Sequence, residues 1–366
     1  MKTRLPAWAA LTIALFIMML MLCSVVNNIP TLPVLSTLPI TANTVPSNPT
    51  PLPVVQLSPT PVLICPSGNC VDACLAKINS ILQTNSVPQS PPEVAAPHGA
   101  KIQAITLVSY FVQGDQLSAP QYAQNIPSNL VPYQQDTVSQ HNIWNYFTAM
   151  VPADQRTELT AFILSTDGKG GMLASVEESS NQPQDWALNV DPLDASKPIN
   201  LTYTLAHEFG HLLTLNSTQV TPDPLYLANP NNPQIYQQES ASCPQYFTTV
   251  GCSLPNSYIN EFFKFFWGKL FNEWSQVNSE KDQNNYYANL AHFYERHPTQ
   301  FISTYAATSP EEDIAESWAH FILEPKPAAD SIAHEKMLFF YEFPNLVQLR
   351  IQMVNGICNY ASASAQ

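Results

Sequence analysis

Charge is scarce in this sequence, and positive charge is the scarcer kind. Only 11% of the 366 residues are charged, against roughly 25% in an ordinary soluble domain. The 28 acidic residues outnumber the 14 basic ones, which leaves a net charge of -14. A surface of that sign repels the phosphates of nucleic acids and anionic lipid headgroups. We therefore expect no nucleic-acid partner.

Two further absences narrow the class of protein. The chain contains no C-x-x-C pair, so the usual cysteine pattern of a structural zinc site is missing. It also contains no internal repeat, which excludes a solenoid. The chain is long enough to bury a sizeable core, and its 45% hydrophobic residues supply the apolar surface for one.

The N-terminus carries the longest uncharged stretch. Lys2 and Arg4 precede residues 7–26, which hold no charge over 20 positions. A helix of that length crosses a hydrocarbon layer of roughly 30 Å, with its basic end kept inside and the rest of the chain sent outward. No A-x-A cleavage site follows the run, so we expect residues 1–28 to be an uncleaved membrane anchor. A cleaved signal peptide or a lipid anchor at Cys23 are the alternatives.

The cysteines agree with an extracytoplasmic location at the cell surface, or with secretion as the alternative. Beyond the apolar run the chain has an even number of them: Cys65, Cys70, Cys74, Cys243, Cys252 and Cys358. Such a count predicts disulfides in an exported protein. Cys243 and Cys252 would close a small loop, and a second bridge would tie the C-terminus to residues 65–74. Free buried thiols are the alternative.

The composition divides the chain into three parts. Residues 29–97 hold 14 of the 33 prolines and only three charged residues, which favours an extended linker over a packed core. Within this linker, Cys70 to Leu82 has helical spacing and can pack against the globular part. The globular part is expected over residues 98–366. Membrane contact is expected through residues 1–28 only.

The globular part is predicted to be α+β, because its strands come first and its helices afterwards. Branched and aromatic residues predict strands over Ile102–Val112, Glu158–Leu164, Met172–Val176 and Trp186–Val190. Helices are expected over Gln140–Met150, Asn200–Leu215, 258–275, 285–296, 311–323 and 330–355. Residues 216–256, rich in Pro and Asn, are expected to be irregular.

The segment T-L-A-H-E-F-G-H-L-L-T-L carries a metal-binding pattern. It places His207 and His211 four residues apart, so both rings project from one face of a helix. Two neutral imidazoles at that spacing can chelate one Zn²⁺ ion at about 2.0–2.1 Å. Glu208 is then placed to act as general base on a water that the metal activates. This is the H-E-x-x-H signature of a metalloprotease. Two ordinary surface histidines are the alternative.

A catalytic zinc needs a third protein ligand. The metzincin pattern would place a glycine at position 214 and a histidine at 217, where this chain has Thr214 and Ser217. A carboxylate is therefore expected, and the downstream candidates are Glu239, Glu261, Glu273, Glu311, Glu312, Asp313 and Glu316.

One of these candidates lies in a more specific context. Residues 303–318 read S-T-Y-A-A-T-S-P-E-E-D-I-A-E-S-W. The segment resembles the one that completes the active site in the anthrax lethal factor and Pro-Pro endopeptidase group of gluzincins. In that group a Tyr precedes the ligand Glu by seven residues, and the Glu begins an E-x-x-A-E pattern. Tyr305 and Glu312 have this spacing, and residues 312–316 have this pattern.

The resemblance implies a zincin-like metallopeptidase domain and a role for each matched residue. It implies that one zinc ion is held by His207, His211 and Glu312. It also implies that Glu208 is the general base and that Tyr305 donates a hydrogen bond to the developing oxyanion. Glu316 matches a position beside the site, where it would support a ligand.

Other interpretations of the same residues stay open. Ser309-Pro310-Glu311-Glu312 is a good helix start, and completing its capping box would by itself explain Glu312. Tyr305 could be a packed side chain in a chain with 15 tyrosines. The 101 residues from His211 to Glu312 exceed what the resemblance leads us to expect, so residues 216–300 would be an insertion at the cleft. Substrate specificity is therefore not carried over.

The sequence thus predicts an extracytoplasmic zinc endopeptidase that acts on proteins or peptides. A surface adhesion module that keeps the fold without turnover is one alternative. Glu208 argues against it, because enzymes that lose activity usually lose the general base. A zinc hydrolase of cell-wall amides is the other alternative, since it would use the same chemistry and differ only in its cleft.

Overall fold

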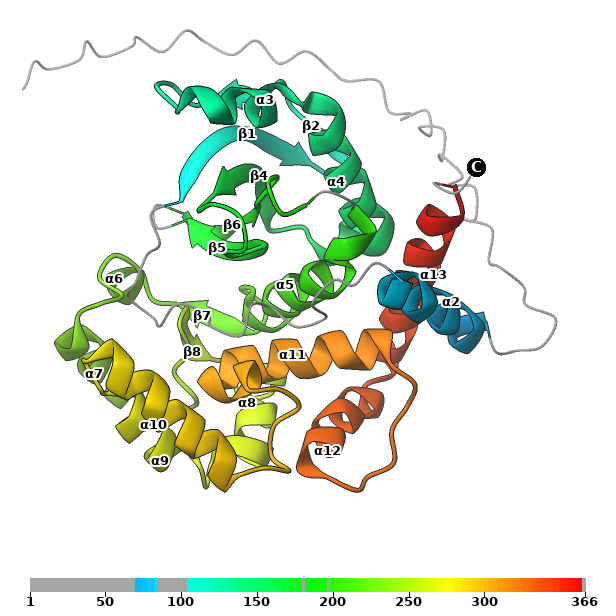
Figure 1. Cartoon of the computed structure of the whole chain (residues 1–366). Coiled ribbons are helices and arrows are strands. Elements are labelled where there is room, and N and C mark those ends of the chain that lie inside the picture. Colours follow the sequence, from blue (N-terminus) through cyan, green and yellow to red (C-terminus); the bar gives the residue numbers. More distant parts are fainter. Residues whose placement is uncertain (1–69, 85–103, 180–181, 196–197, 364–366) are drawn as a thin grey trace, which may run out of the picture. The chain divides into compact units, whose positions relative to one another are not determined.

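The structure is a computed structural model that describes residues 70–84, 104–179, 182–195 and 198–363 (Figure 1). All of them belong to one compact unit, Pro61–Gln366. The predictions for the anchor and for most of the linker lie outside the described residues. Among the helices that the structure describes, none has the length and apolar character needed to cross a membrane.

The first half of the described chain forms a mixed β-sheet in the order β2-β1-β4-β6-β5, with β3 paired to β1. The strands are β1 (Ile105–Gln113), β2 (Gln116–Leu117), β3 (Gln121–Tyr122), β4 (Leu159–Thr166), β5 (Ala174–Ser179) and β6 (Gln182–Val190). Strands β4 and β6 are parallel, and the other pairs are antiparallel. Strand β5 lies at the edge of the sheet, and all four predicted strands are present.

Helices surround this sheet. The first group comprises η1 (Ser128–Leu130), α3 (Val131–Gln135), α4 (Thr137–Met150) and η2 (Ala153–Gln155). Trp144 and Phe147 of α4 are fully buried and contact Phe162 of β4 or each other. Next come the 3-10 turn η3 (Pro198–Leu201) and α5 (Thr202–Leu215), which packs against the edge strand β5. Residues Asn200–Leu215 are therefore helical as predicted.

Residues 216–256 are not irregular, and that prediction was wrong. They form β7 (Val220–Pro222), α6 (Pro224–Leu227), α7 (Pro233–Ser242) and β8 (Gly251–Ser253), with β7 and β8 antiparallel. The side chain of Asp223 caps α6 and that of Asn232 caps α7, and each is followed by a proline in the first turn. The prolines and the asparagine that suggested loops are thus helix-start residues.

The second half of the described chain is helical. Its elements are α8 (Tyr258–Phe262), the π-turn η4 (Phe263–Trp267), α9 (Phe271–Asn278), α10 (Gln283–Arg296), η5 (Tyr305–Thr308), α11 (Pro310–Leu323), α12 (Ile332–Phe339), η6 (Phe340–Glu342) and α13 (Pro344–Ala363). Two predicted helices, 258–275 and 330–355, are each divided. The second divides where Pro344, which has no amide hydrogen, begins α13. The α+β order is confirmed.

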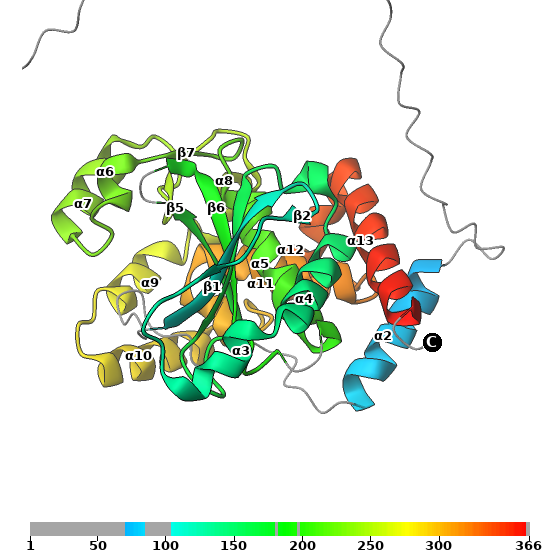
Figure 2. The same ribbon diagram turned by 90° about the horizontal axis from the view of Figure 1, so that it is seen from above.

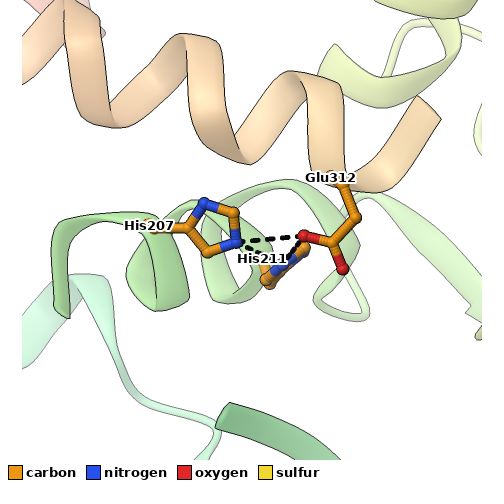
Figure 3. Close-up of side chains that lie close together, drawn as sticks. All are labelled: His207, His211 and Glu312. Carbon is orange, nitrogen blue, oxygen red and sulfur yellow. Dashed lines mark hydrogen bonds and ion pairs between the residues drawn. The ribbon is translucent and has the colours of Figure 1, made fainter. Parts of the chain in front are cut away.

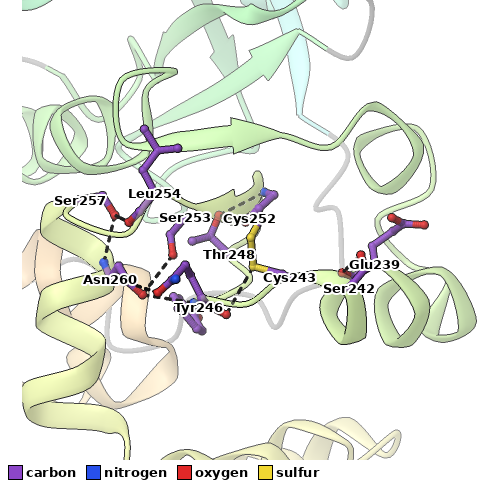
Figure 4. The surroundings of a disulfide bond; sticks show 12 residues. Glu239, Ser242, Cys243, Tyr246, Thr248, Cys252, Ser253, Leu254, Ser257 and Asn260 are labelled. Carbon is purple, nitrogen blue, oxygen red and sulfur yellow. Dashed lines mark hydrogen bonds between the residues drawn. A yellow bond between two sulfur atoms is a disulfide. The ribbon is translucent and has the colours of Figure 1, made fainter.

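Two disulfides join parts of the chain. Cys74 of α2 (Cys70–Thr84) pairs with Cys358 of α13, and these two helices lie side by side (Figure 2). Leu75 and Ile78 of α2 are buried in the core, so the helix packs on the globular part as the sequence suggested. Cys243 pairs with Cys252 after α7 (Figure 4). Both predicted bridges are confirmed, while Cys65 lies outside the described residues.

The two bridges should differ in their effect on stability. The Cys74–Cys358 bridge closes a loop of 284 residues and the Cys243–Cys252 bridge a loop of 9. On the chain-entropy scale these correspond to about 5.6 and about 2.6 kcal/mol. Replacing the Cys74 and Cys358 pair by serine should lower the free energy of unfolding by the larger amount, measured by chemical denaturation.

Thiol titration of the unfolded, unreduced protein should find almost no free thiol. Six free thiols, or equal effects of the two double variants, would contradict the assignment.

Candidate metal centre and active site

Three side chains from two helices converge beside the sheet edge. His207 and His211 come from α5 and Glu312 comes from α11 (Figure 3). Oε2 of Glu312 lies 3.1 Å from Nε2 of His207 and 3.3 Å from Nε2 of His211, and the two nitrogens are 3.1 Å apart. Ligand atoms of a tetrahedral zinc ion are about 3.3 Å apart when its bonds are 2.0–2.1 Å long. Two imidazoles and one carboxylate are therefore a donor set, in type and spacing, that fits zinc.

Close packing of two helices brings the ligands together. Helix α11 runs alongside α5 (Figure 1). Gly210 lies at their contact, where a Cβ atom would stand 3.1 Å from Cα of Ala315. Because that distance is tighter than nine in ten real Cβ contacts, a larger residue at position 210 would require the α11 backbone to shift by a few tenths of an ångström. Glycine between the two histidines therefore lets α11 bring Glu312 to them.

The backbone and the side chain of Glu312 have different partners. The amide of Glu312 donates to Oγ of Ser309 at 3.1 Å, so Ser309 caps α11 and Pro310 occupies its first turn. The carboxylate of Glu312 is directed to the histidines instead. The backbone of this residue thus belongs to the cap, while its side chain belongs to the metal-binding group.

The neighbouring acidic residues point elsewhere, because successive residues of a helix are about 100° apart around its axis. Glu311 accepts hydrogen bonds from the Tyr246 hydroxyl at 2.9 Å and from the Thr249 amide at 3.2 Å. Glu239, another candidate, lies on α7 rather than in irregular chain, with its carboxylate bonded to Gln238. Three further candidates form ion pairs away from the histidines: Asp313 with Lys336, Glu261 with Lys264, and Glu273 with Arg296.

Glu208 is buried next to the metal-binding group. Burial raises the pKa of its carboxyl to about 7, and the charge of Glu312 adds to this, while His207 and His211 act in the opposite direction. The backbone of Val176 in the edge strand β5 hydrogen-bonds to the same carboxylate. Glu208 is therefore held between the histidine pair and the edge of the sheet, and it can exchange a proton near neutral pH.

Tyr305 lies beside His207. The centroids of the two rings are 5.7 Å apart. Burial raises the pKa of Tyr305 well above its ordinary value, and the carboxylates of Glu312 and Glu208 raise it further. The phenol therefore keeps its proton and can serve as a hydrogen-bond donor at the site.

Glu316 contacts His207 at Nδ1, the ring nitrogen that does not face Glu312. Its Oε1 lies 3.0 Å from Nδ1 of His207, and its Oε2 accepts a hydrogen bond from Ser303 at 2.6 Å. Burial acts to raise the pKa of Glu316, but the close contact with His207 and the hydrogen bond from Ser303 bring it below the ordinary value. An ionised carboxylate on Nδ1 leaves Nε2 unprotonated for a metal and fixes the orientation of the ring.

Replacing Glu316 by glutamine should therefore weaken zinc binding. The expected loss is about 10- to 100-fold in affinity, the range observed when such a supporting partner is removed. Competition with a chelator measures it. Glu324→Gln, at the C-cap of the same helix in an exposed pair with His320, is the control and should bind zinc like the wild type. Equal affinity in the Glu316 variant would show that His207 does not depend on this contact.

Sequence reasoning missed two features of the site. Trp186–Val190 and Met172–Val176 were predicted only as strands, without their order; β6 is paired on both sides, and the edge strand beside α5 is β5. Ser303 was quoted in the matched segment without a role. Neither feature has a sequence signal, because the edge position of β5 depends on strand order and Ser303 is an ordinary residue in a loop.

Comparison with known proteins agrees with this site. Residues 260–340 match the model of a family described as "Putative zinc-binding metallo-peptidase". The matched segment contains Tyr305 and Glu312 but begins after the two histidines. No curated protein and no solved structure matches the chain. Through this segment the chain is similar to a family of zinc-binding metallopeptidases, and the group of His207, His211 and Glu312 is the candidate zinc site.

Proposed function

We propose that this chain is a zinc-dependent endopeptidase of the gluzincin type, in keeping with its resemblance to the lethal factor and Pro-Pro endopeptidase group. The observation that carries the proposal is the convergence of His207, His211 and Glu312 beside the buried Glu208. A zinc ion held there would supply a Lewis acid that polarises a carbonyl and a water molecule.

Three residues of the chain would have separate roles in the reaction. Glu208 takes the proton of the attacking water and returns it to the leaving amine, a role suited to a carboxyl with a pKa near neutrality. The protonated Tyr305 donates a hydrogen bond to the oxyanion that develops on the scissile carbonyl. Glu316 holds His207 in place for the metal.

A polypeptide is the substrate that the sheet edge favours. Strand β5 pairs with β6 on one side and has no strand on the other among the described residues. An extended peptide can add to such an edge through main-chain hydrogen bonds. Because Val176 of β5 contacts Glu208, a peptide bound along this edge would pass the general base. This supports an endopeptidase over an adhesion module without turnover.

We also propose that the enzyme works outside the cytoplasm, anchored in the membrane by residues 1–28. Two observations support this location: the uncharged run over residues 7–26 and the two disulfides, which persist in oxidising compartments.

Peptide-library profiling tests the proposed function. The protein from residue 29 onward should cleave internal peptide bonds, and a chelator should stop the cleavage, as followed by mass spectrometry. Zinc bound without any cleavage would favour the adhesion module. Release of fragments from cell-wall material, with no cleavage of peptides, would favour the amide hydrolase.

Tyr305→Phe tests the oxyanion role. Removing one oxyanion donor costs about 10²–10³ in kcat, so we expect a fall of that size with little change in KM and with zinc retained. Steady-state kinetics and metal analysis measure these values. Tyr122→Phe, at an exposed position on β3, is the control and should behave as wild type. A normal kcat in the Tyr305 variant would leave Tyr305 as a packing residue only.

A further inference from the structure

Ser303 lies between two parts of the proposed active site. Its hydroxyl donates to Oε2 of Glu316 at 2.6 Å and accepts from the amide of Ala306 at 3.0 Å. The other oxygen of Glu316 lies 3.0 Å from Nδ1 of His207. One hydroxyl therefore connects the residue that supports a metal ligand with the short turn that carries Tyr305.

The proton of this hydroxyl has a fixed direction. A serine hydroxyl has one proton to donate and can accept a bond at the same time. Because the Ala306 amide is bonded to the oxygen, the proton is left for Glu316. Glu316 is wholly buried, and a buried carboxylate that loses a donor must shift to find another partner. That shift would disturb its contact with His207.

The turn depends on the same hydroxyl. The 3-10 turn η5, Tyr305–Thr308, follows Thr304, whose side chain makes no capping hydrogen bond. Ala306 is fully buried, so its amide could not turn to water if Ser303 were replaced. The bond from Ala306 to Ser303 therefore holds the start of the turn, and with it the backbone of Tyr305.

We propose that Ser303 is a positioning residue that aligns the metal ligand His207, through Glu316, with the oxyanion donor Tyr305. The kinetic consequence rests on the proposed endopeptidase function, whereas the consequence for metal binding does not. A purely local role, in which Ser303 only caps the turn, makes a different forecast: loss of stability without any effect on the metal.

Zinc affinity, measured by competition with a chelator, separates the two. Ser303→Ala should weaken zinc binding about tenfold, at the lower end of the effect of supporting partners, and Ser303→Thr should restore it. Ser303→Asp can still accept from the Ala306 amide, but its carboxylate repels Glu316 instead of donating to it, so it should lose more affinity than Ser303→Ala. Ser331→Ala removes a comparable cap, on the amide of His334 at 3.1 Å, and should leave zinc affinity unchanged. Wild-type affinity in both Ser303→Ala and Ser303→Asp would overturn the proposal.

A double variant tests the path through Glu316. In a Glu316→Gln background, Ser303→Ala should cause no further loss of zinc affinity, since residues that act through one contact are not additive. Additive losses of zinc affinity would overturn the link from Ser303 through Glu316 to His207.

Kinetics test the effect of Ser303 on the turn that carries Tyr305. Ser303→Ala should lower kcat with little change in KM, and an unchanged kcat would overturn the proposal that Ser303 positions Tyr305. If the wild type cleaves no peptide, the endopeptidase function fails, while the zinc measurements still decide the role of Ser303.

Discussion

Replacing Glu208 by glutamine is expected to abolish peptide cleavage while zinc stays bound. Glutamine has nearly the same shape but cannot take a proton from the attacking water. General bases contribute about 10²–10⁴-fold to rate, so kcat should fall by at least that range. The metal should remain, because the metal-binding group consists of His207, His211 and Glu312 and does not include Glu208. Steady-state kinetics and metal analysis of the same preparation measure both quantities.

The control for this experiment is a glutamate far from the site. Glu261→Gln breaks a surface pair with Lys264 and should leave both kcat and zinc content unchanged. Full activity of the Glu208 variant, or wild-type protein without zinc, would rule out the proposed mechanism. Loss of zinc together with activity in the Glu208 variant would show that this carboxylate helps to hold the metal.

Replacing Glu312 by glutamine is expected to weaken zinc binding by orders of magnitude. The carboxylate supplies the anionic ligand, and its oxygen lies within 3.1–3.3 Å of both histidine nitrogens. A neutral amide is a far weaker ligand for a divalent cation, so cleavage should be lost with the metal. Chelator competition for wild type, Glu312→Gln and Glu239→Gln measures the difference. The Glu239 variant should bind zinc normally.

The capping interpretation forecasts a different result. If the side chain of Glu312 served only the helix start, the change to glutamine would cost about 1 kcal/mol or less, because Gln is also accepted at that position of a capping box. Zinc would then stay bound. Thermal unfolding of the metal-free proteins separates the two effects, since Ser309 still caps α11 in either case. Zinc loss in the Glu239 variant alone would identify a different third ligand.

Much of the architecture could be predicted because it depends on local patterns. Branched and aromatic runs identified the strands, and the helix over Asn200–Leu215 followed from its apolar spacing. The errors have physical causes as well. Asp223-Pro224 and Asn232-Pro233 suggested loops, yet in the structure they start helices α6 and α7. The same residue types favour turns and helix starts, so composition alone does not separate the two.

Some features of the candidate site also follow from local sequence, and others do not. The sequence by itself determined the histidine pair and its glutamate, because one turn of helix sets their spacing. It also determined the cysteines available for pairing and the cap at Ser309. It could not determine the third ligand from spacing alone, since seven downstream carboxylates were candidates and only the resemblance favoured Glu312.

Only the tertiary structure decided which carboxylate meets the histidines. His207 and Glu312 are 105 residues apart, and their contact depends on the close approach of α5 and α11 at Gly210. The tertiary structure also places β5 at the edge of the sheet and joins Ser303 to Glu316. Local sequence sets where a helix begins and which residues share its face, but which faces meet is set by how the whole core packs.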